Sequence, residues 1–214
     1  DLFGHLERVG VVPCSKVDLR ARRSWLAKQH TLGHARSTLQ RRAAAARVFF
    51  AWAHETGHAT TDPAANLRSP KSIRVLPPTL EQATAASMLD EAIATARETG
   101  GPVAARDVAL LELLYSTGIR VSELCGLNVD DLDRQRSVVR VLGKGSKERT
   151  VPVGVPAVRA VEAWLAKARP QLITGESGQA MFLGERGKRI DPRVVRRIVH
   201  RSLQVTEGAP DLGP

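Results

Sequence analysis

The sequence lacks the patterns that mark several common classes of protein. Its only cysteines, Cys14 and Cys125, lie far apart and form neither a metal-ligand spacing nor a disulfide framework. No apolar run approaches the roughly 20 residues that a membrane-spanning helix needs, and no signal peptide is visible at the start. We therefore expect a protein of the reducing cytoplasm, with no metal and no membrane partner.

Internal repeats and low-complexity segments are also missing. The apolar share of 43% is too high for a disordered chain and suffices for a packed core. A length of 214 residues suits one large domain or two small ones. Because Asp1 is not an initiator methionine, we expect the natural N-terminus to lie further upstream.

Positive charge is what the chain has in excess. It carries 32 Lys and Arg against 22 Asp and Glu, a net charge of +10. Residues 1–76 hold 13 basic and 5 acidic side chains, whereas residues 77–214 hold 19 and 17. Such a basic segment favours nucleic acid or an acidic membrane surface as its partner. We expect the first third to grip duplex DNA, and a solvated arginine-rich helix is the alternative.

Local signals divide the chain into a helical domain (1–69), a linker (70–78) and a mixed domain (79–214). Prolines at 70, 77 and 78 disfavour helix in the linker. In the first domain we predict helices over 15–30 and 38–55. Apolar residues at alternating steps of four and three share one face of the second of these helices: Leu39, Ala43, Ala46, Phe50 and Ala53.

The second domain is predicted to contain helices over 79–99, 105–117, 121–126, 156–169 and 192–206. Thr79 with Gln82 resembles a capping box, and Asp191-Pro192 is a strong helix start. Segments 137–142 and 149–153 read as strands of a β-hairpin. The fold class is therefore mainly α with a small β-hairpin (α+β). On the last helix, Val194, Ile198 and Val205 share one face, while the opposite face carries Arg193, Arg196, Arg197 and His200.

Two cations are the candidate catalytic residues. Arg120 follows a glycine and opens a short helix, where a planar guanidinium and free N–H groups favour an anion such as phosphate. Lys144 lies between two glycines at the hairpin tip, where an ammonium could protonate a leaving oxygen. The alternatives are a surface arginine paired with Glu123 or Asp130, and a hairpin lysine that only blunts an edge. Lys147 is the local rival of Lys144.

The candidate DNA-binding residues lie mostly on the basic helix of the first domain. Backbone phosphates would meet Arg36, Arg41, Arg42 and Arg47, whereas base edges would meet Ser37, Thr38 and Gln40. In the second domain the candidates are Lys147, Arg193, Arg196 and Arg197.

Other conspicuous residues favour structural roles. Tyr115, the only tyrosine, stands in an apolar run and is expected in the core with its hydroxyl satisfied. The tryptophans at 25, 52 and 164 lie in helical patterns and are also expected in the core. The carboxylates at 130, 131 and 133 are expected in a solvated loop rather than a metal site.

The segments GIRVSELCGL and VVRVLGKGSKERTVPV, taken together, resemble the catalytic domain of tyrosine recombinases, most closely the bacterial XerC/XerD subgroup. The likeness is long and specific there, and it extends more loosely over nearly the whole chain. It implies a helical core-binding domain followed by a catalytic domain. Arg120 matches the first arginine of the family pattern, and Lys144 matches its lysine.

The resemblance also implies a mechanism. In such enzymes a tyrosine attacks a DNA phosphodiester to form a 3′-phosphotyrosyl link, and a released 5′-hydroxyl then attacks that link. Two arginines and a histidine hold the phosphate, and the lysine is the general acid. No metal and no other cofactor is implied, because arginines neutralise the phosphate charge.

One departure from the family pattern decides what this chain is expected to do. A His-x-x-Arg motif would be expected directly after residues 211–214, and the nucleophilic tyrosine would follow it. We therefore expect this chain to bind DNA but not to cleave it. The resemblance further implies an inverted-repeat DNA site, a related XerD-like recombinase in a DNA-bound tetramer, and chromosome dimer resolution at cell division. The alternatives are a phage or mobile-element integrase and a non-catalytic DNA-binding module.

Overall fold

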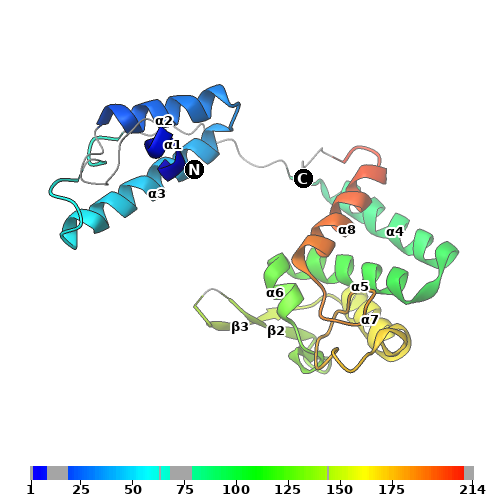
Figure 1. Ribbon diagram of the computed structural model, residues 1–214. Coiled ribbons are helices and arrows are strands. Elements are labelled where there is room, and N and C mark those ends of the chain that lie inside the picture. Colours follow the sequence, from blue (N-terminus) through cyan, green and yellow to red (C-terminus); the bar gives the residue numbers. More distant parts are fainter. Residues whose placement is uncertain (1, 9–18, 63, 68–78, 144, 210–214) are drawn as a thin grey trace. The chain divides into compact units, whose positions relative to one another are not determined.

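The chain folds into two compact units, Asp1–Leu76 and Pro77–Pro214. A computed structural model describes residues 2–8, 19–62, 64–67, 79–143 and 145–209 (Figure 1). The predicted linker, 70–78, lies outside these described residues, as do Lys144 and residues 210–214. Among the described helices, none has the length and apolarity required to cross a bilayer.

The first unit is helical. Its helices are α1 (Leu2–Arg8), α2 (Leu19–Thr31) and α3 (Arg36–Glu55). The five residues predicted to share one face of α3 are all buried, from Leu39 to Ala53. They pack with Leu6 of α1 and Trp25 of α2, so the apolar stripe of α3 is the centre of this unit's core.

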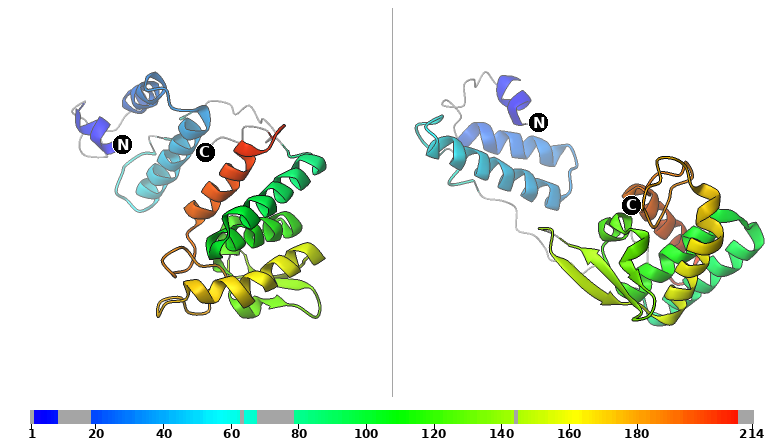
Figure 2. Two further views of the ribbon diagram at one scale, coloured as in Figure 1. Left: turned by 90° about the vertical axis from the view of Figure 1, so that its right-hand side faces the viewer. Right: turned by 90° about the horizontal axis from the view of Figure 1, so that it is seen from below.

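The second unit is built around α5 (Gly101–Thr117), whose apolar residues pack against helices on several sides. The surrounding helices are α4 (Gln82–Thr99), α6 (Val121–Gly126), α7 (Val155–Ala163) and α8 (Pro192–Val205). A π-helical turn, Trp164–Ala168, and a 3₁₀ turn, Arg169–Leu172, extend α7. Figures 1 and 2 show α4, α5 and α8 lying side by side.

A small antiparallel sheet lies at one end of the second unit. It contains β1 (Leu132–Asp133), β2 (Val138–Leu142) and β3 (Glu148–Pro152) in that order, after a 3₁₀ turn at Val129–Asp131. Val139 and Val141 of β2 point into the core, whereas their neighbours Arg140 and Leu142 are exposed. Both figures show the β2–β3 hairpin extending beyond the helices of its unit. The predicted mainly α fold with a small hairpin is confirmed.

Several predicted helix boundaries are wrong by a few residues. The N-cap of α4 is Glu81 rather than Thr79. Helix α5 begins at Gly101, four residues earlier than predicted, because a proline is tolerated in the first turn of a helix and Pro102 lies there. The break between α4 and α5 is confirmed at Gly100, whose φ of 65° suits a residue without a side chain.

Some residues predicted to lie in the core are not there. Trp25 and Trp164 are buried, but Trp52 is 51% exposed. On α8 the buried residues are Val195, Ile198 and Leu203, whereas Val205 is 66% exposed. Periodicity identifies which residues share a face, but burial also requires an element that covers that face.

Candidate functional site

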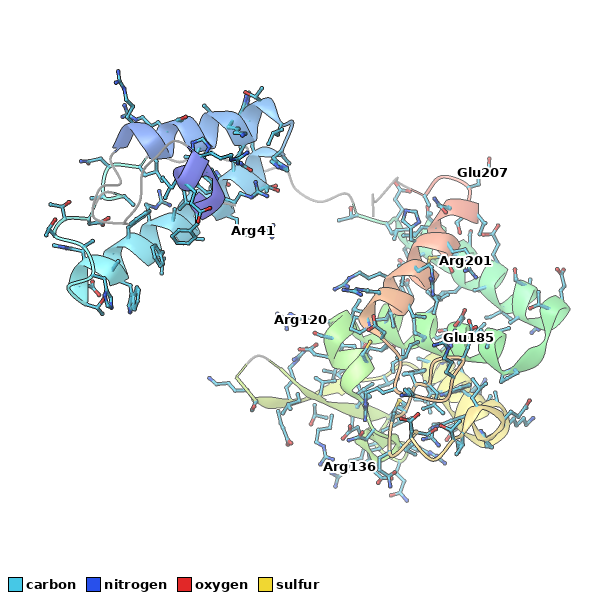
Figure 3. The ribbon with its side chains drawn as sticks, in the orientation of Figure 1. Arg41, Arg120, Arg136, Glu185, Arg201 and Glu207 are labelled. Carbon is cyan, nitrogen blue, oxygen red and sulfur yellow. The ribbon has the colours of Figure 1, made fainter. Side chains whose placement is uncertain are left out.

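Arg120 stands at the junction between α5 and α6. Helix α5 ends at Gly118, whose φ of 60° turns the chain, and Ile119 then anchors it in the core. Arg120 is the N-cap of α6 in extended conformation. Its side chain is 73% exposed, and Figure 3 shows it projecting outward beside α6. The guanidinium is therefore accessible to a ligand from solvent.

Glu123 holds Arg120 in this position. One carboxylate oxygen, Oε2, accepts the backbone N–H of Arg120 at 2.8 Å. The other, Oε1, accepts a hydrogen bond from Arg120 Nη1 at 3.1 Å. The pairing of Arg120 with Glu123, which the sequence offered as an alternative to phosphate binding, is thus present. It does not compete with ligand binding, because most of the guanidinium remains in solvent.

The same carboxylate binds Arg149 of β3. Arg149 Nη1 and Nη2 donate to Glu123 Oε1 and Oε2, each at 2.8 Å. These two hydrogen bonds are the main reason that the pKa of Glu123 falls from 4.5 to about 2, and the bonds from Arg120 add to them although burial opposes the shift. Glu123 is therefore a buried anion between two cations.

Sequence reasoning did not assign Glu123 or Arg149 to the site. A glutamate three residues after an N-cap is a familiar capping signal, and Glu123 does accept the N-cap N–H. Its burial was not predictable from that signal. It arises because the hairpin, 26 residues later in the chain, folds over it.

The neck of the hairpin lies against this ion pair. The N–H of Gly143 donates to the carbonyl of Lys147 at 2.8 Å and closes the loop. A Cβ atom at Gly143 would be 3.2 Å from Arg149 Nη1 and 3.6 Å from Glu123 Oε1. Lys147 is exposed, and Lys144 lies outside the described residues. The structure thus brings the base of the lysine-bearing loop to Glu123, the residue that holds Arg120.

Helix α8 places a basic face beside α6. Asp191 Oδ1 accepts the N–H of Arg193 and caps the helix as predicted. The predicted cations Arg193, Arg196 and Arg197 are all exposed. Burial, together with the charge of Asp191, raises the pKa of the Cys125 thiol in α6 to about 11. Helix α8 contacts α6, and Figure 1 shows the two helices next to each other.

Arg189, a further cation that the sequence analysis missed, supports the other end of α6. Its Nη1 donates to the carbonyls of Cys125 and Leu127 at 3.0 and 2.8 Å. Its Nη2 donates to Asn128 Oδ1 at 2.6 Å. The carbonyls at a helix C-terminus lack helical partners and attract cations. Arg189 and Glu123 therefore fix α6 from both ends.

The predicted DNA-binding residues of the first unit differ in their surroundings. Arg36, Ser37 and Arg41 are exposed, and Figure 3 shows Arg41 on the outside of α3. Arg42 donates to Gln29 of α2, and Arg47 donates to the carbonyl of Leu67. Thr38 and Gln40 are half-buried. The exposed residues lie in the first two turns of α3, so that end presents the basic surface.

Tyr115 corrects another expectation. It was predicted to be a core residue, yet it is 49% exposed. Its ring lines a shallow groove together with uncharged residues, among them Leu80, Gln82, Met88 and Val199. None of the described residues that line this groove carries a positive charge.

The carboxylates before the hairpin make protein contacts. Asp131 accepts hydrogen bonds from the backbone N–H of Asn128 and from the guanidinium of Arg140. Across the parts of the chain that the structure describes, no three His, Cys, Asp or Glu side chains gather in a way that could hold a metal ion.

Comparison with known proteins identifies relatives of this arrangement. Residues 80–214 match the phage integrase family. The chain is 49% identical over 208 residues to the tyrosine recombinase XerC of Mycobacterium sp. (strain KMS), a match that covers 97% of this chain and 69% of the relative. It is also 49% identical over 213 residues to the tyrosine recombinase XerC of Mycobacterium leprae, covering 100% of this chain and 71% of the relative.

Solved structures share the fold. The XerH site-specific recombinase, in a post-cleavage complex with its palindromic difH substrate, superposes with a TM-score of 0.73 at 18% identity, covering 93% of this chain and 59% of that one. A Tn1549 transposon integrase bound to a circular-intermediate DNA gives a TM-score of 0.72 at 19% identity, covering 98% and 72%.

Proposed function

Since this chain belongs to the phage integrase family of tyrosine recombinases, we propose that it grips duplex DNA and binds the phosphate at which strands are cleaved and rejoined in site-specific recombination of the XerC kind. The observation that carries this proposal is the cluster around Glu123. It holds an exposed guanidinium next to a lysine-bearing hairpin, and the basic face of α8 lies beside the same short helix.

Each part of the site has a chemical role in this proposal. Arg120 has one nitrogen on Glu123, and its other donors remain free to hold non-bridging phosphate oxygens. Lys144 at the hairpin tip is the proposed general acid for the leaving oxygen. Arg193, Arg196, Arg197 and Lys147 are proposed to contact the flanking phosphates.

The first unit is proposed to grip the same duplex. Arg36, Arg41, Arg42 and Arg47 would face phosphates, and Ser37, Thr38 and Gln40 would reach base edges. The role of Arg42 requires its contact with Gln29 to loosen or to be shared. We further propose a cytoplasmic location, an inverted-repeat site, a XerD-like partner in a DNA-bound tetramer, and chromosome dimer resolution at cell division. The relatives at 49% identity are XerC proteins, which favours this function over that of a mobile-element integrase or a non-catalytic module.

Salt dependence of DNA binding tests the phosphate contacts. Each phosphate that a protein cation neutralises releases a condensed counterion from the DNA. Each such contact contributes about 0.9 to the magnitude of the slope of log affinity against log salt concentration. Arg120→Gln should therefore lower the slope by about one contact, and the triple substitution of Arg193, Arg196 and Arg197 by Gln by about three. Arg136→Gln is the matched control, because its side chain is 83% exposed and lies at another end of the unit (Figure 3).

The outcome separates the proposal from its alternatives. Unchanged slopes for both the Arg120 and the α8 variants, with binding intact, would show that this surface does not face DNA. A reduction by Arg136→Gln as large as that by Arg120→Gln would show only a general effect of charge.

A further inference from the structure

Arg149 has no assigned role in the phosphate site, although it is tied directly to it. It lies on β3, paired with Val141 of β2, one step before the last pair of the hairpin. Both of its terminal nitrogens are used by Glu123, at 2.8 Å each. Two parallel hydrogen bonds fix both the distance and the plane of a guanidinium. Arg149 therefore holds the hairpin to α6 in one orientation.

The contacts of Glu123 are shared evenly between the two arginines. Oε1 accepts from Arg120 Nη1 and Arg149 Nη1, while Oε2 accepts from the Arg120 backbone and Arg149 Nη2. The carboxylate is buried, with a side chain only 3% exposed. A shift of Arg149 would therefore move the carboxylate or break its contacts, and either change would reach Arg120.

The hairpin neck is the third member of this junction. The closing hydrogen bond, from the Gly143 N–H to the Lys147 carbonyl, lies just beyond the pair Leu142 and Glu148. A Cβ at Gly143 would lie 3.2 Å from Arg149 Nη1, so the neck packs on the guanidinium itself. The position of the neck thus depends on Arg149.

We propose that Arg149 is a positioning residue, which sets the hairpin neck, defined by the hydrogen-bonded residues Gly143 and Lys147, at a fixed place relative to the guanidinium of Arg120 through their shared carboxylate. This inference rests on the proposed function, in which Arg120 binds phosphate. In this scheme Arg149 acts through Glu123 and not as a DNA contact, because each of its terminal nitrogens donates to that buried carboxylate. Its substitution should weaken phosphate binding only through Arg120 and the neck.

A double-mutant cycle tests this dependence in the whole 214-residue chain. Duplexes selected for binding from a random pool serve as the probe. The salt slope of binding is measured for the parent, Arg120→Gln, Arg149→Gln and the double variant. Arg149→Gln should lower the slope by about 0.9, as Arg120→Gln does, and the double variant should lose no more than Arg120→Gln alone. Arg149→Lys should restore part of the slope, because an ammonium can bind one oxygen of Glu123.

Arg140→Gln is the matched control. Arg140 lies on the neighbouring strand, is exposed, and pairs with Asp131 at 3.0 Å. It should leave the slope unchanged. If Arg149→Gln fails to fold, the neutral pair Glu123→Gln with Arg149→Gln removes the unpaired buried charge and should show the same loss.

A second readout is independent of DNA. Amide hydrogen exchange at Gly143 should accelerate in Arg149→Gln and stay unchanged in Arg140→Gln, because Arg149 lies against the neck whereas Arg140 pairs with Asp131. Additive losses in the cycle would mean that Arg149 binds phosphate directly, and would overturn the proposal. Unchanged exchange at Gly143 would overturn it as well. If Arg120→Gln has no effect on the slope, the proposed function fails at Arg120, and the exchange measurement alone decides the mechanical role of Arg149.

Discussion

Acid should remove a specific part of the stability of the second unit through Glu123. The pKa of this carboxyl is about 2 in the folded chain against 4.5 ordinarily, chiefly because Arg149 donates two hydrogen bonds to it. A group with a depressed folded pKa stabilises the fold above its unfolded pKa and loses that stabilisation as the pH falls. The contribution of Glu123 should therefore be complete above about pH 5 and decline between pH 4.5 and pH 2.

The size of the effect follows from the shift. A difference of this size corresponds to about 3 kcal/mol in total, because one pKa unit equals about 1.4 kcal/mol. About 2 kcal/mol of this should be lost by pH 3, where an unfolded glutamate is mostly protonated and the folded one is still ionised. Both arginines touch solvent, so screening makes this an upper value.

Urea unfolding of the parent and of Glu123→Gln at pH 6 and pH 3 measures this loss. Substituting Trp25 and Trp52 by Phe in both proteins leaves Trp164, which is buried in the second unit, as the only fluorescent tryptophan. The difference in unfolding free energy between the two proteins should shrink by about 2 kcal/mol between the two pH values. A difference that stays constant, or grows in acid, would refute the assignment of the depressed pKa to Glu123.

Three further predictions follow from the geometry. Gly187→Ala should lower the free energy of unfolding in urea by at least about 2 kcal/mol, because the φ of Gly187 is 76° and a Cβ would lie 2.6 Å from the Leu172 carbonyl oxygen. Gly178→Ala should lower it by only about 1 kcal/mol, because Gly178 has a φ of 49° but open space around it. Equal losses in the two variants would contradict this reasoning. Arg189→Ala should destabilise the unit by about 1–3 kcal/mol and speed amide exchange in α6, and Arg189→Lys should recover part of both; an unaffected α6 would show that these carbonyls need no cation. The 214-residue chain should form no covalent adduct with a nicked suicide duplex, because its only tyrosine lies in an uncharged groove; an adduct would refute this expectation.

Much of the fold could be predicted from local patterns. The buried face of α3 follows from its apolar spacing, and all five predicted residues are buried. The hairpin follows from two short β-prone runs around glycines, and its strands agree to within one residue. These features depend on contacts between neighbours in sequence, which the sequence displays directly.

The failures involve contacts between distant segments. Tyr115 and Trp52 were expected in the core, and Val205 was assigned to the apolar face of α8, but the described residues leave a large part of each exposed. Glu123 was considered only as a surface partner of Arg120, whereas the hairpin buries it. Which elements meet is a property of the tertiary fold, and neither periodicity nor capping signals specify it. The position of Lys144 relative to Arg120 stays a prediction.

The hairpin is attached to the junction of α5 and α6 at both of its ends. At the far end of β3, the N–H of Gly154 donates to Ser116 Oγ at 2.7 Å, and at the tip end Arg149 grips Glu123. The β2–β3 hairpin is therefore joined to the α5–α6 junction by contacts at both of its ends. A hairpin exchanged between related recombinases should therefore be transplanted together with the α5–α6 junction. A graft of the two strands alone would lose the contacts with Ser116 and Glu123, which fix the orientation of the hairpin.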